Sequence, residues 1–224
     1  MRIGILGGTG PAGSALGARL ASVGYTVVIG SRTRERALDV CDTLRAKHPD
    51  LSLALEGGDN ADAAACDVVV LATPWDGAAT TARDNVSLLK GKVVISMANA
   101  LVKVGHEFQP LLPPRGSVAA HVQAAVPDCR VVAAFHHLPA KELGHLGVPI
   151  DSDVLICSDD PGATRIAMEI AGRIPGCRPL DAGELSNATA IEAFTAVLLQ
   201  LNVRYRTRVA PKLTGITRDP RAEA

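Results

Sequence analysis

Residues 1–13 read MRIGILGGTGPAG, and this stretch decides the fold. It begins with a short apolar run, Arg2 to Leu6, that predicts a strand. Glycines in the pattern G-x-G-x-x-G follow at Gly8, Gly10 and Gly13, and a helical pattern comes next. A strand, a glycine turn and a helix in this order are typical of the first unit of a dinucleotide-binding sheet.

Each glycine has its own task in such a unit. Gly8 permits the tight turn, Gly10 lets the backbone approach a pyrophosphate, and Gly13 lets the helix pack close to the strand. The helix N-terminus, which includes Ala12, offers N–H groups and a partial positive charge to an anion. Pro11 lacks an N–H but suits the first helical position. The alternative interpretation is a structural glycine turn that binds no ligand.

Strands and helices are expected to alternate along the chain. The expected strands are 2–6, 25–29, 51–55, 67–72, 92–96, 130–135, 154–157 and 178–180. The expected helices are 11–23, 33–47, 60–65, 76–85, 117–125, 161–174 and 185–208, with an irregular segment at 104–114 and a frayed tail from Thr217. This rhythm predicts an α/β protein: a doubly wound, parallel, Rossmann-type sheet over residues 1–140. A small C-terminal α/β domain over 141–224 ends in a long helix and is expected to cover the cleft.

Composition excludes several classes of partner and site. Lys and Arg together number 23, as do Asp and Glu, so no global field favours nucleic acid or a membrane surface. No apolar run is long enough for a membrane span. The five cysteines are widely spaced and form no C-x-x-C motif, which argues against a metal site or a disulfide framework. A cytoplasmic location is therefore expected, since the N-terminal apolar stretch is a strand rather than a leader.

The cofactor is indicated by the end of the second expected strand. Units that bind NAD place an acidic residue there, to bond the ribose 2′-hydroxyl. This chain instead has Ser31, then Arg32, Arg34 and Arg36. Arg36 lies one helical turn after Arg32, so both can reach one phosphate, whereas Arg34 should point elsewhere. These residues predict NADP(H); the alternative is that all three arginines are surface charges at a helix start.

Three later strand ends are candidates for the rest of the site. Thr73, Pro74 and Trp75, the single tryptophan, follow the fourth strand, and Met97 follows the fifth. The sixth strand runs into the pair His136 and His137, of which one is expected to face the cleft and the other the packing side. Zinc is not expected, because adjacent histidines share geometry poorly and no third ligand is evident. The alternatives are core roles for Trp75 and for both histidines.

Several stretches together resemble one family, the NADPH:coenzyme F420 oxidoreductases, or deazaflavin reductases. They are GGTG at 7–10, VIGSR at 28–32, TPW at 73–75, FHHLPA at 135–140, CSDD at 157–160 and RPLDAGELSN at 178–187. The resemblance implies hydride exchange between NADP(H) and coenzyme F420, an 8-hydroxy-5-deazaflavin. It also implies NADP contacts at Thr9, Gly10, Ser31, Arg32, Arg36, Trp75, Ala79, Leu101 and Ala140. Pro11 and Gly77 depart from the family pattern, which bears on the local pyrophosphate geometry.

The complete expected site joins both lines of reasoning. The cofactor-binding residues are Gly8, Thr9, Gly10, Pro11, Ala12, Gly13, Ser31, Arg32, Arg36, Thr73, Pro74, Trp75, Ala79, Met97, Leu101 and Ala140. His136 and His137 are the catalytic candidates, expected to orient the deazaflavin or stabilise its developing charge, and no metal is expected. The last helix is expected to form a homodimer or cover the cleft. Two other functions stay open: NADPH-dependent reduction of a flavin, ferric chelate or small imine, and NADPH sensing without catalysis.

Overall fold

A parallel β-sheet lies at the centre of the protein, whose computed structural model describes residues 1–216. The sheet has six strands in the order β3-β2-β1-β4-β5-β8. They are β1 (Arg2–Leu6), β2 (Thr26–Ser31), β3 (Leu55–Asp59), β4 (Val68–Leu71), β5 (Val93–Ser96) and β8 (Arg130–Ala133). All neighbouring pairs are parallel. Because the strand order reverses between β1 and β4, this is the doubly wound, Rossmann-type sheet that the sequence predicts.

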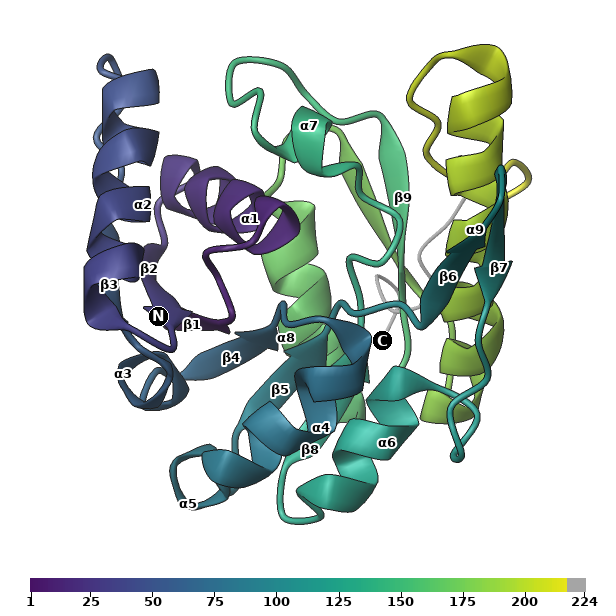
Figure 1. The fold of residues 1–224 in the computed structure, drawn as a ribbon, viewed down its shortest axis with the longest axis horizontal. Helices are drawn as coiled ribbons and strands as arrows, with labels where there is room; N and C mark the ends of the chain where they lie inside the picture. The colour runs from purple at the N-terminus through teal and green to yellow at the C-terminus, as the bar shows by residue number, and fades with distance from the viewer. Residues whose placement is uncertain (217–224) are drawn as a thin grey trace.

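Helices cover both faces of the sheet (Figure 1). The helices of this part are α1 (Pro11–Ser22), α2 (Arg34–Lys47), α3 (Asn60–Ala64), α4 (Trp75–Asp84), α5 (Val86–Leu89) and α6 (Val118–Ala125). In Figure 1, α1 and α2 lie on one side of the sheet and α4 and α6 lie on the other. The strands are buried on both sides, which is why β4 is the uninterrupted apolar run VVVL.

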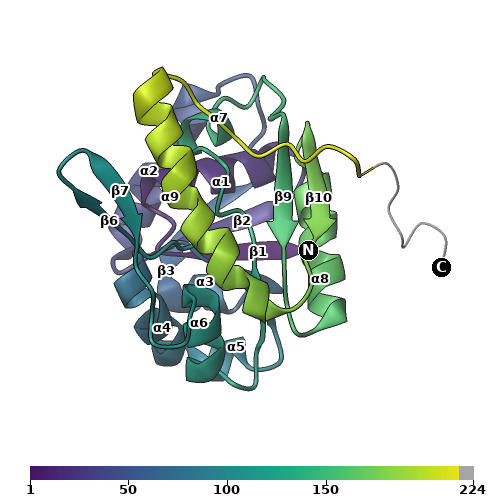
Figure 2. The ribbon, with the colours of Figure 1, turned by 90° about the vertical axis from the view of Figure 1, so that its right-hand side faces the viewer.

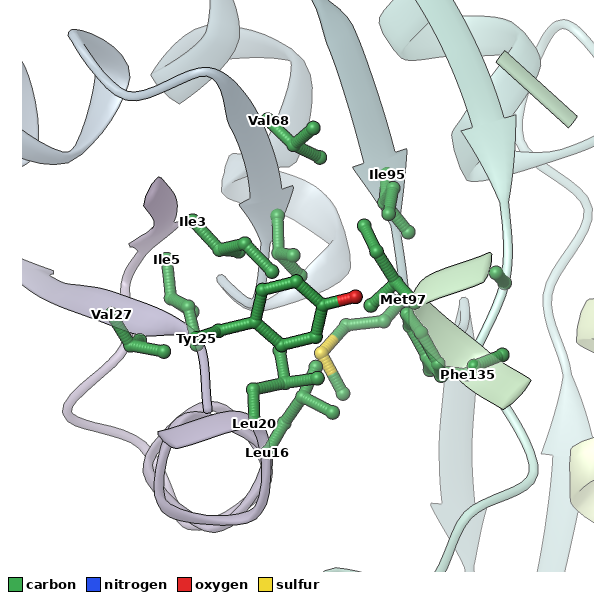
Figure 3. Close-up of a cluster of buried hydrophobic side chains, with 14 of the residues drawn as sticks. Ile3, Ile5, Leu16, Leu20, Tyr25, Val27, Val68, Ile95, Met97 and Phe135 are labelled. Atoms are coloured by element: carbon green, nitrogen blue, oxygen red, sulfur yellow. The ribbon is translucent and has the colours of Figure 1, made fainter. Parts of the chain in front are cut away.

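Two apolar clusters, one on each face, make up the core. The first joins alternate residues of the strands to α1 and α8, and Figure 3 shows part of it: Ile3, Ile5, Leu16, Leu20, Tyr25, Met97 and Phe135. The second joins the other set of strand residues to α4 and α6: Leu6, Val28, Val69, Leu71, Ala78, Ala82, Ala119 and Val122. Successive strand residues point to opposite faces, so one pleated sheet supplies both clusters.

The third strand lies later in the chain than the sequence predicts. Residues 51–55 alternate in polarity, but the strand is Leu55–Asp59, which includes two glycines. A Cβ at Gly57 would stand 2.7 Å from the backbone nitrogen of Leu38 in α2. The strand therefore pairs where glycine allows the helix to approach, and the predicted range 51–55 was wrong by about one strand length.

The segment 104–114, expected to be irregular, is partly a hairpin. It consists of β6 (Leu101–Val104) and β7 (Glu107–Pro110), which are antiparallel. Gly105 occupies the turn with a φ of +59°, where glycine is favoured. The hairpin packs along the long C-terminal helix, to which the N–H of Phe108 is tied by the Gln200 side chain at 3.2 Å. Prolines alone were a poor guide, because Pro110 ends the second strand at an edge.

The rest of the chain follows β8. Its elements are α7 (Ala140–Leu143), β9 (Ser152–Ile156), α8 (Pro161–Gly172), β10 (Cys177–Asp181), the short 3₁₀ helix η1 (Leu185–Asn187) and α9 (Ala188–Tyr205). Strands β9 and β10 are parallel and form a second small sheet, beside which α9 lies (Figure 2). Side chains of β9 and α8 belong to the same apolar cluster as Ile3 and Ile5.

Two expectations concern the end of the chain and the membrane. The tail from Thr217 lies outside the described residues. Among the helices within 1–216, none is long and apolar enough to cross a membrane.

Candidate active site

The glycine turn between β1 and α1 is shaped for close packing on one side and for open space on the other. A Cβ at Gly8 would lie 2.8 Å from the Ile5 carbonyl oxygen, and one at Gly13 would lie 2.9 Å from the Gly8 Cα. At Gly10 the nearest atom to such a Cβ is 3.8 Å away, so its missing side chain leaves room. No side chain caps α1 at Gly10. The first N–H groups of α1 can therefore bind an anion.

A cavity of about 410 Å³ opens at this turn, and we call it the first cavity. Its lining residues are Gly7, Thr9, Gly10, Ser31, Arg32, Arg36, Asn60, Ala72, Thr73, Pro74, Asp76, Gly77 and Thr81. Most follow the carboxyl ends of β1, β2 and β4, where ligands collect in doubly wound sheets, and the others lie in α2, α3 and α4. The structure thus brings the glycine turn, the arginines and the Thr73-Pro74 segment around one space.

The three arginines after β2 differ in their partners. Arg34 pairs with Asp62 at 2.5 Å. Arg32 and Arg36 are exposed, line the first cavity, and form no ion pair among the described residues. Ser31 beside them is 5% exposed. The chain therefore presents two uncompensated guanidinium groups and a hydroxyl to one space, which is the donor set that suits a phosphate group.

The opposite wall of the first cavity includes Thr73, which the sequence predicts as a cofactor-binding residue, and Asn60, which it does not. The Oγ1 atom of Thr73 is buried and has no hydrogen-bond partner. Asn60 accepts a hydrogen bond from the N–H of Gly7 at 3.2 Å and so fixes the turn. At Gly77 nothing among the described residues lies within 4 Å of an added Cβ, so this residue leaves open space. An orphaned hydroxyl and open space both fit a bound polar ligand.

Some predicted cofactor residues do not line the first cavity. Trp75 is half-buried and packs against the apolar cluster under α4, and Ala79 is 6% exposed in the same helix. Met97 lies in the core on the other face (Figure 3). Pro11 lines a neighbouring groove with Ala140. Their assignment to cofactor binding stays a prediction.

A larger space, of about 590 Å³, lies beyond the ends of β5 and β8, and we call it the second cavity. It is bounded by the hairpin, the segment after β8 and α9: Asn99, Leu101, Phe108, His136, His137, Leu138, Pro139, Ala140, Lys141, Thr195, Leu198, Leu199, Asn202, Val203, Arg208 and Val209. Both candidate histidines and the predicted residues Leu101 and Ala140 are among them. The last helix was expected near the cleft, but the individual residues Phe108 of the hairpin and Thr195 of α9 were missed, because nothing local in the sequence marks them.

Both histidines are among the residues around the second cavity, but the strand alternation from which opposite orientations were predicted does not apply to them. The expectation assumed an extended strand to residue 135, but β8 ends at Ala133 and Phe135 has a φ of +66°. The N–H of Leu138 then bonds the Phe135 carbonyl at 3.3 Å, so the chain turns at the histidines. In a turn, adjacent side chains no longer alternate.

The two histidines have different surroundings. The Nε2 of His137 lies 2.7 Å from the Ile191 carbonyl, to which it donates, and its ring meets Phe194 edge-on at 5.5 Å. His136 is 6% exposed, and within residues 1–216 neither of its ring nitrogens forms a hydrogen bond of normal geometry. Burial, with His137 alongside, lowers the pKa of His136 to about 3. A neutral imidazole has one donor and one acceptor nitrogen, which makes His136 a candidate to bond a polar ligand, although both nitrogens are buried in this structure.

Polar groups beside His136 are ordered by one another. Thr195 of α9 donates to the Asn99 side-chain oxygen at 3.0 Å, and the Asn99 amide donates to the His136 carbonyl at 3.3 Å. This short chain of bonds joins the end of β5, the turn after β8 and α9. It holds a group of polar side chains in place at one side of a cavity whose other lining residues are largely aliphatic.

A buried arginine of α1 holds the segment that leads from the histidines into α7. Arg19 is 0% exposed and donates four hydrogen bonds to carbonyl oxygens. The acceptors and distances are Glu142 at 2.9 Å, Leu143 at 3.1 Å, His145 at 2.7 Å and Leu146 at 3.1 Å. Helix α1 begins at the glycine turn beside the first cavity, and α7 lines the second cavity. Because the Arg19 bonds hold α1 and α7 together, this one side chain links the positions of the two cavities.

Helix α9 is joined to α6 through a buried carboxylate. Glu192 is 4% exposed, and its two oxygens accept from the N–H groups of Val118 at 2.8 Å and Ala119 at 3.0 Å. These are orphan donors at the start of α6, so Glu192 acts as a cap from another helix. Burial raises the pKa of the Glu192 carboxyl to about 7.

The raised pKa predicts a pH-dependent contribution to stability. A group that binds its proton more tightly in the folded state stabilises it fully below the unfolded value, 4.5, and this contribution is lost as the pH rises through about 7. The loss should amount to up to about 3 kcal/mol. We expect the difference in unfolding free energy between the wild type and Glu192→Gln, measured in urea, to change across this window. A difference that is constant from pH 4.5 to 8 would contradict the assignment.

Within residues 1–216, no cluster of three or more His, Cys, Asp and Glu side chains is arranged to hold a metal ion.

Known proteins resemble this chain in sequence and in architecture. Residues 2–100 match a family model described as NADP oxidoreductase coenzyme F420-dependent. The chain is 36% identical, over 93% of its length and 95% of the relative's, to the F420-dependent NADP reductase of Methanocaldococcus jannaschii. It is 35% identical to that of Methanothermobacter marburgensis, over 94% and 96%. A crystal structure from Arthrobacter sp. FB24 shares the fold, with a TM-score of 0.75 at 24% identity over 93% of this chain and 99% of that one. The chain therefore belongs to the family of F420-dependent NADP reductases.

Proposed function

We propose that this protein transfers a hydride between NADP(H) and the deazaflavin coenzyme F420. The observation that carries the proposal is the placement of the two cavities along one sheet edge. The first cavity lies at the ends of β2, β1 and β4, and the second lies beyond β5 and β8, which come next in strand order. A dinucleotide that lies across this edge has its phosphate end among the arginines and its other end toward His136.

The residues present fit these ligands. Ser31, Arg32 and Arg36 would bind the 2′-phosphate, and the free N–H groups at the start of α1 would bind the pyrophosphate. When bound, NADP(H) and the deazaflavin supply the hydride chemistry themselves. The chain contributes orientation and exclusion of water, and the neutral His136 ring offers a hydrogen bond at a fixed place. This role requires neither a nucleophile nor a metal.

The test is a parallel assay with purified protein. NADPH and NADH are compared as donors, and deazaflavin, FMN and a ferric chelate are compared as acceptors, each with and without a chelator. We expect turnover with NADPH and deazaflavin that the chelator does not change. Preference for FMN or ferric chelate would favour the alternative reductase, and NADPH binding without turnover on any acceptor would favour a sensor.

The histidines predict two separable effects. His136→Leu removes an unpartnered buried ring, so stability should hold while the acceptor KM rises about tenfold. His137→Leu leaves the Ile191 carbonyl unpaired, so the free energy of unfolding should fall by about 1–3 kcal/mol. Thermal unfolding and steady-state kinetics on both variants check this, with the NADPH KM as the internal control. An acceptor KM of His136→Leu equal to that of the wild type would show that His136 does not bind the acceptor.

We also propose a cytoplasmic homodimer in which residues 141–224 cover the acceptor cleft. The proposal that this part of the chain covers the cleft is supported by the α9 residues that line the second cavity. The dimer is supported by apolar side chains of α9 that stay exposed, with Phe194 at 39%, Val197 at 50% and Val203 at 52%. Ile191 and Leu198 of the same helix are buried and would take no part in such an interface. All five cysteines are free thiols, as a reducing compartment favours. A one-chain mass by light scattering would overturn the dimer.

A further inference from the structure

The chain does not stop at α9 but returns across the molecule. Arg206 ends the helix in the left-handed conformation with a φ of 52°. Residues 207–216, which we call the strap, then run from the end of α9 over β9 and β10 (Figure 2). At the start of the strap, Arg208 and Val209 form part of the wall of the second cavity, beside Asn202 and Val203 of α9.

The far end of the strap is held by an ion pair whose carboxylate is buried and whose arginine is partly exposed. Asp153 of β9 is 0% exposed and accepts from the Nε and Nη2 of Arg178 in β10, at 2.8 and 2.6 Å. Its carboxylate also accepts from the N–H of Leu213 at 2.6 Å. Arg178 in turn donates to two strap carbonyls, Leu213 at 2.5 Å and Ile216 at 3.1 Å. We call Asp153 and Arg178 the clamp.

Backbone bonds complete the attachment. The N–H of Asp153 donates to the Pro211 carbonyl at 2.8 Å. Nearer the cavity, the N–H of Val209 donates to the Asn202 side chain at 2.6 Å. The wall residues Arg208 and Val209 therefore lie at or next to the near attachment, and the clamp holds the strap beyond them.

The strap has little else to fix its position. It contains no helix or strand, and residues 212–216 are exposed, whereas Pro211 is buried. A segment with few buried apolar contacts opens easily unless specific bonds hold it. The clamp provides such specific bonds. A bidentate arginine–carboxylate pair has one favoured geometry, and the strap bonds to the donors and acceptors that the pair leaves unused. A second ion pair, between Lys212 and Asp151 at 2.5 Å, is exposed and contributes little by comparison.

We propose that Asp153 and Arg178 are positioning residues for the hydride acceptor: they hold the strap so that Arg208 and Val209 close the second cavity. The inference rests on the proposed function, in which this cavity takes the deazaflavin. The clamp touches neither cavity, because its residues line neither the first nor the second. Loosening it should therefore affect the acceptor and leave NADP(H) unaffected.

The test compares two aspartates two residues apart. Asp153→Asn removes the clamp's charge without leaving a buried unpaired carboxylate, and Arg178→Lys, a second variant, keeps the charge but loses the bidentate geometry. Asp151→Asn, which breaks only the exposed pair, is the matched control. We expect the acceptor KM to rise about tenfold or more in Asp153→Asn and less in Arg178→Lys. The kcat at saturating acceptor, the NADPH affinity and all parameters of Asp151→Asn should stay near the wild type.

Limited trypsin digestion supplies a readout that does not depend on turnover. Cleavage after Lys212, followed by mass spectrometry, should be faster in Asp153→Asn than in the wild type or Asp151→Asn. Faster cleavage with an unchanged acceptor KM would overturn the positioning role, and so would an equal loss of NADPH and acceptor affinity. Absence of wild-type turnover would instead overturn the proposed function, which keeps the two failures distinct.

Discussion

The Kd for NADPH should rise by about 100-fold or more when Arg32 and Arg36 are both replaced by alanine. Each guanidinium can make a charge-assisted bond to a 2′-phosphate, worth about 1.5–3 kcal/mol. Both side chains are exposed, and solvent screening keeps the expected loss toward the lower end of their sum. Fluorescence titration with NADPH and NADH measures the effect. The Kd for NADH should change little, because NADH lacks the phosphate.

Arg34→Ala is the matched control, since Arg34 lies between the two other arginines but is paired with Asp62. It should leave the Kd for NADPH near the wild-type value. Raising the salt concentration should weaken NADPH binding in the wild type more than in the double variant, because the removed interaction is between charges. Equal affinity of the wild type for NADH and NADPH would contradict the phosphate assignment.

The sequence was most informative where the determinants are local. The order strand, glycine turn and helix lies within some twenty residues, and the glycine geometry follows from backbone sterics alone. The arginines after β2 are predictable for the same reason: a parallel sheet places the end of β2 beside the end of β1, so Ser31 and Arg32 lie near the turn. Alternating strands and helices then fix a doubly wound sheet with few alternatives.

Prediction from the sequence failed where packing between residues far apart in the chain determines the local structure. The true β3 contains Gly57 and Gly58, which are poor strand formers, and their lack of a side chain allows the close approach of α2 at Gly57 and of Asp62 in α3 at Gly58. The turn at Phe135 could not be read from FHHLPA, since a positive φ in a bulky residue is held by its surroundings. The clamp joins residues 25 positions apart and holds a strap some 60 positions from Asp153, so nothing local in the sequence pairs Asp153 with Arg178, although Arg178 begins the stretch RPLDAGELSN.

Arg19 is the clearest example of a residue whose role depends on long-range packing. Its replacement is expected to have a large effect on stability. Arg19→Met should lower the free energy of unfolding by about 2–4 kcal/mol, because four carbonyl oxygens lose their donor. Methionine keeps most of the buried volume, so the loss is polar rather than a cavity effect. Part of the segment is exposed at His145, where water can replace a donor, which keeps the loss below the sum of four buried bonds. Urea unfolding measures the change.

Arg83→Met is the control, since Arg83 is an exposed arginine in the last turn of α4 and its replacement should change stability by no more than about 0.5 kcal/mol. Arg19→Lys should recover part of the loss, because an ammonium group offers three donors without the planar fork. Since these bonds tie α1 to α7, the folded Arg19→Met protein should also bind the acceptor less tightly. Unfolding equal to that of the wild type would mean that water satisfies the four carbonyls, and that α7 is held by its packing against α1 alone.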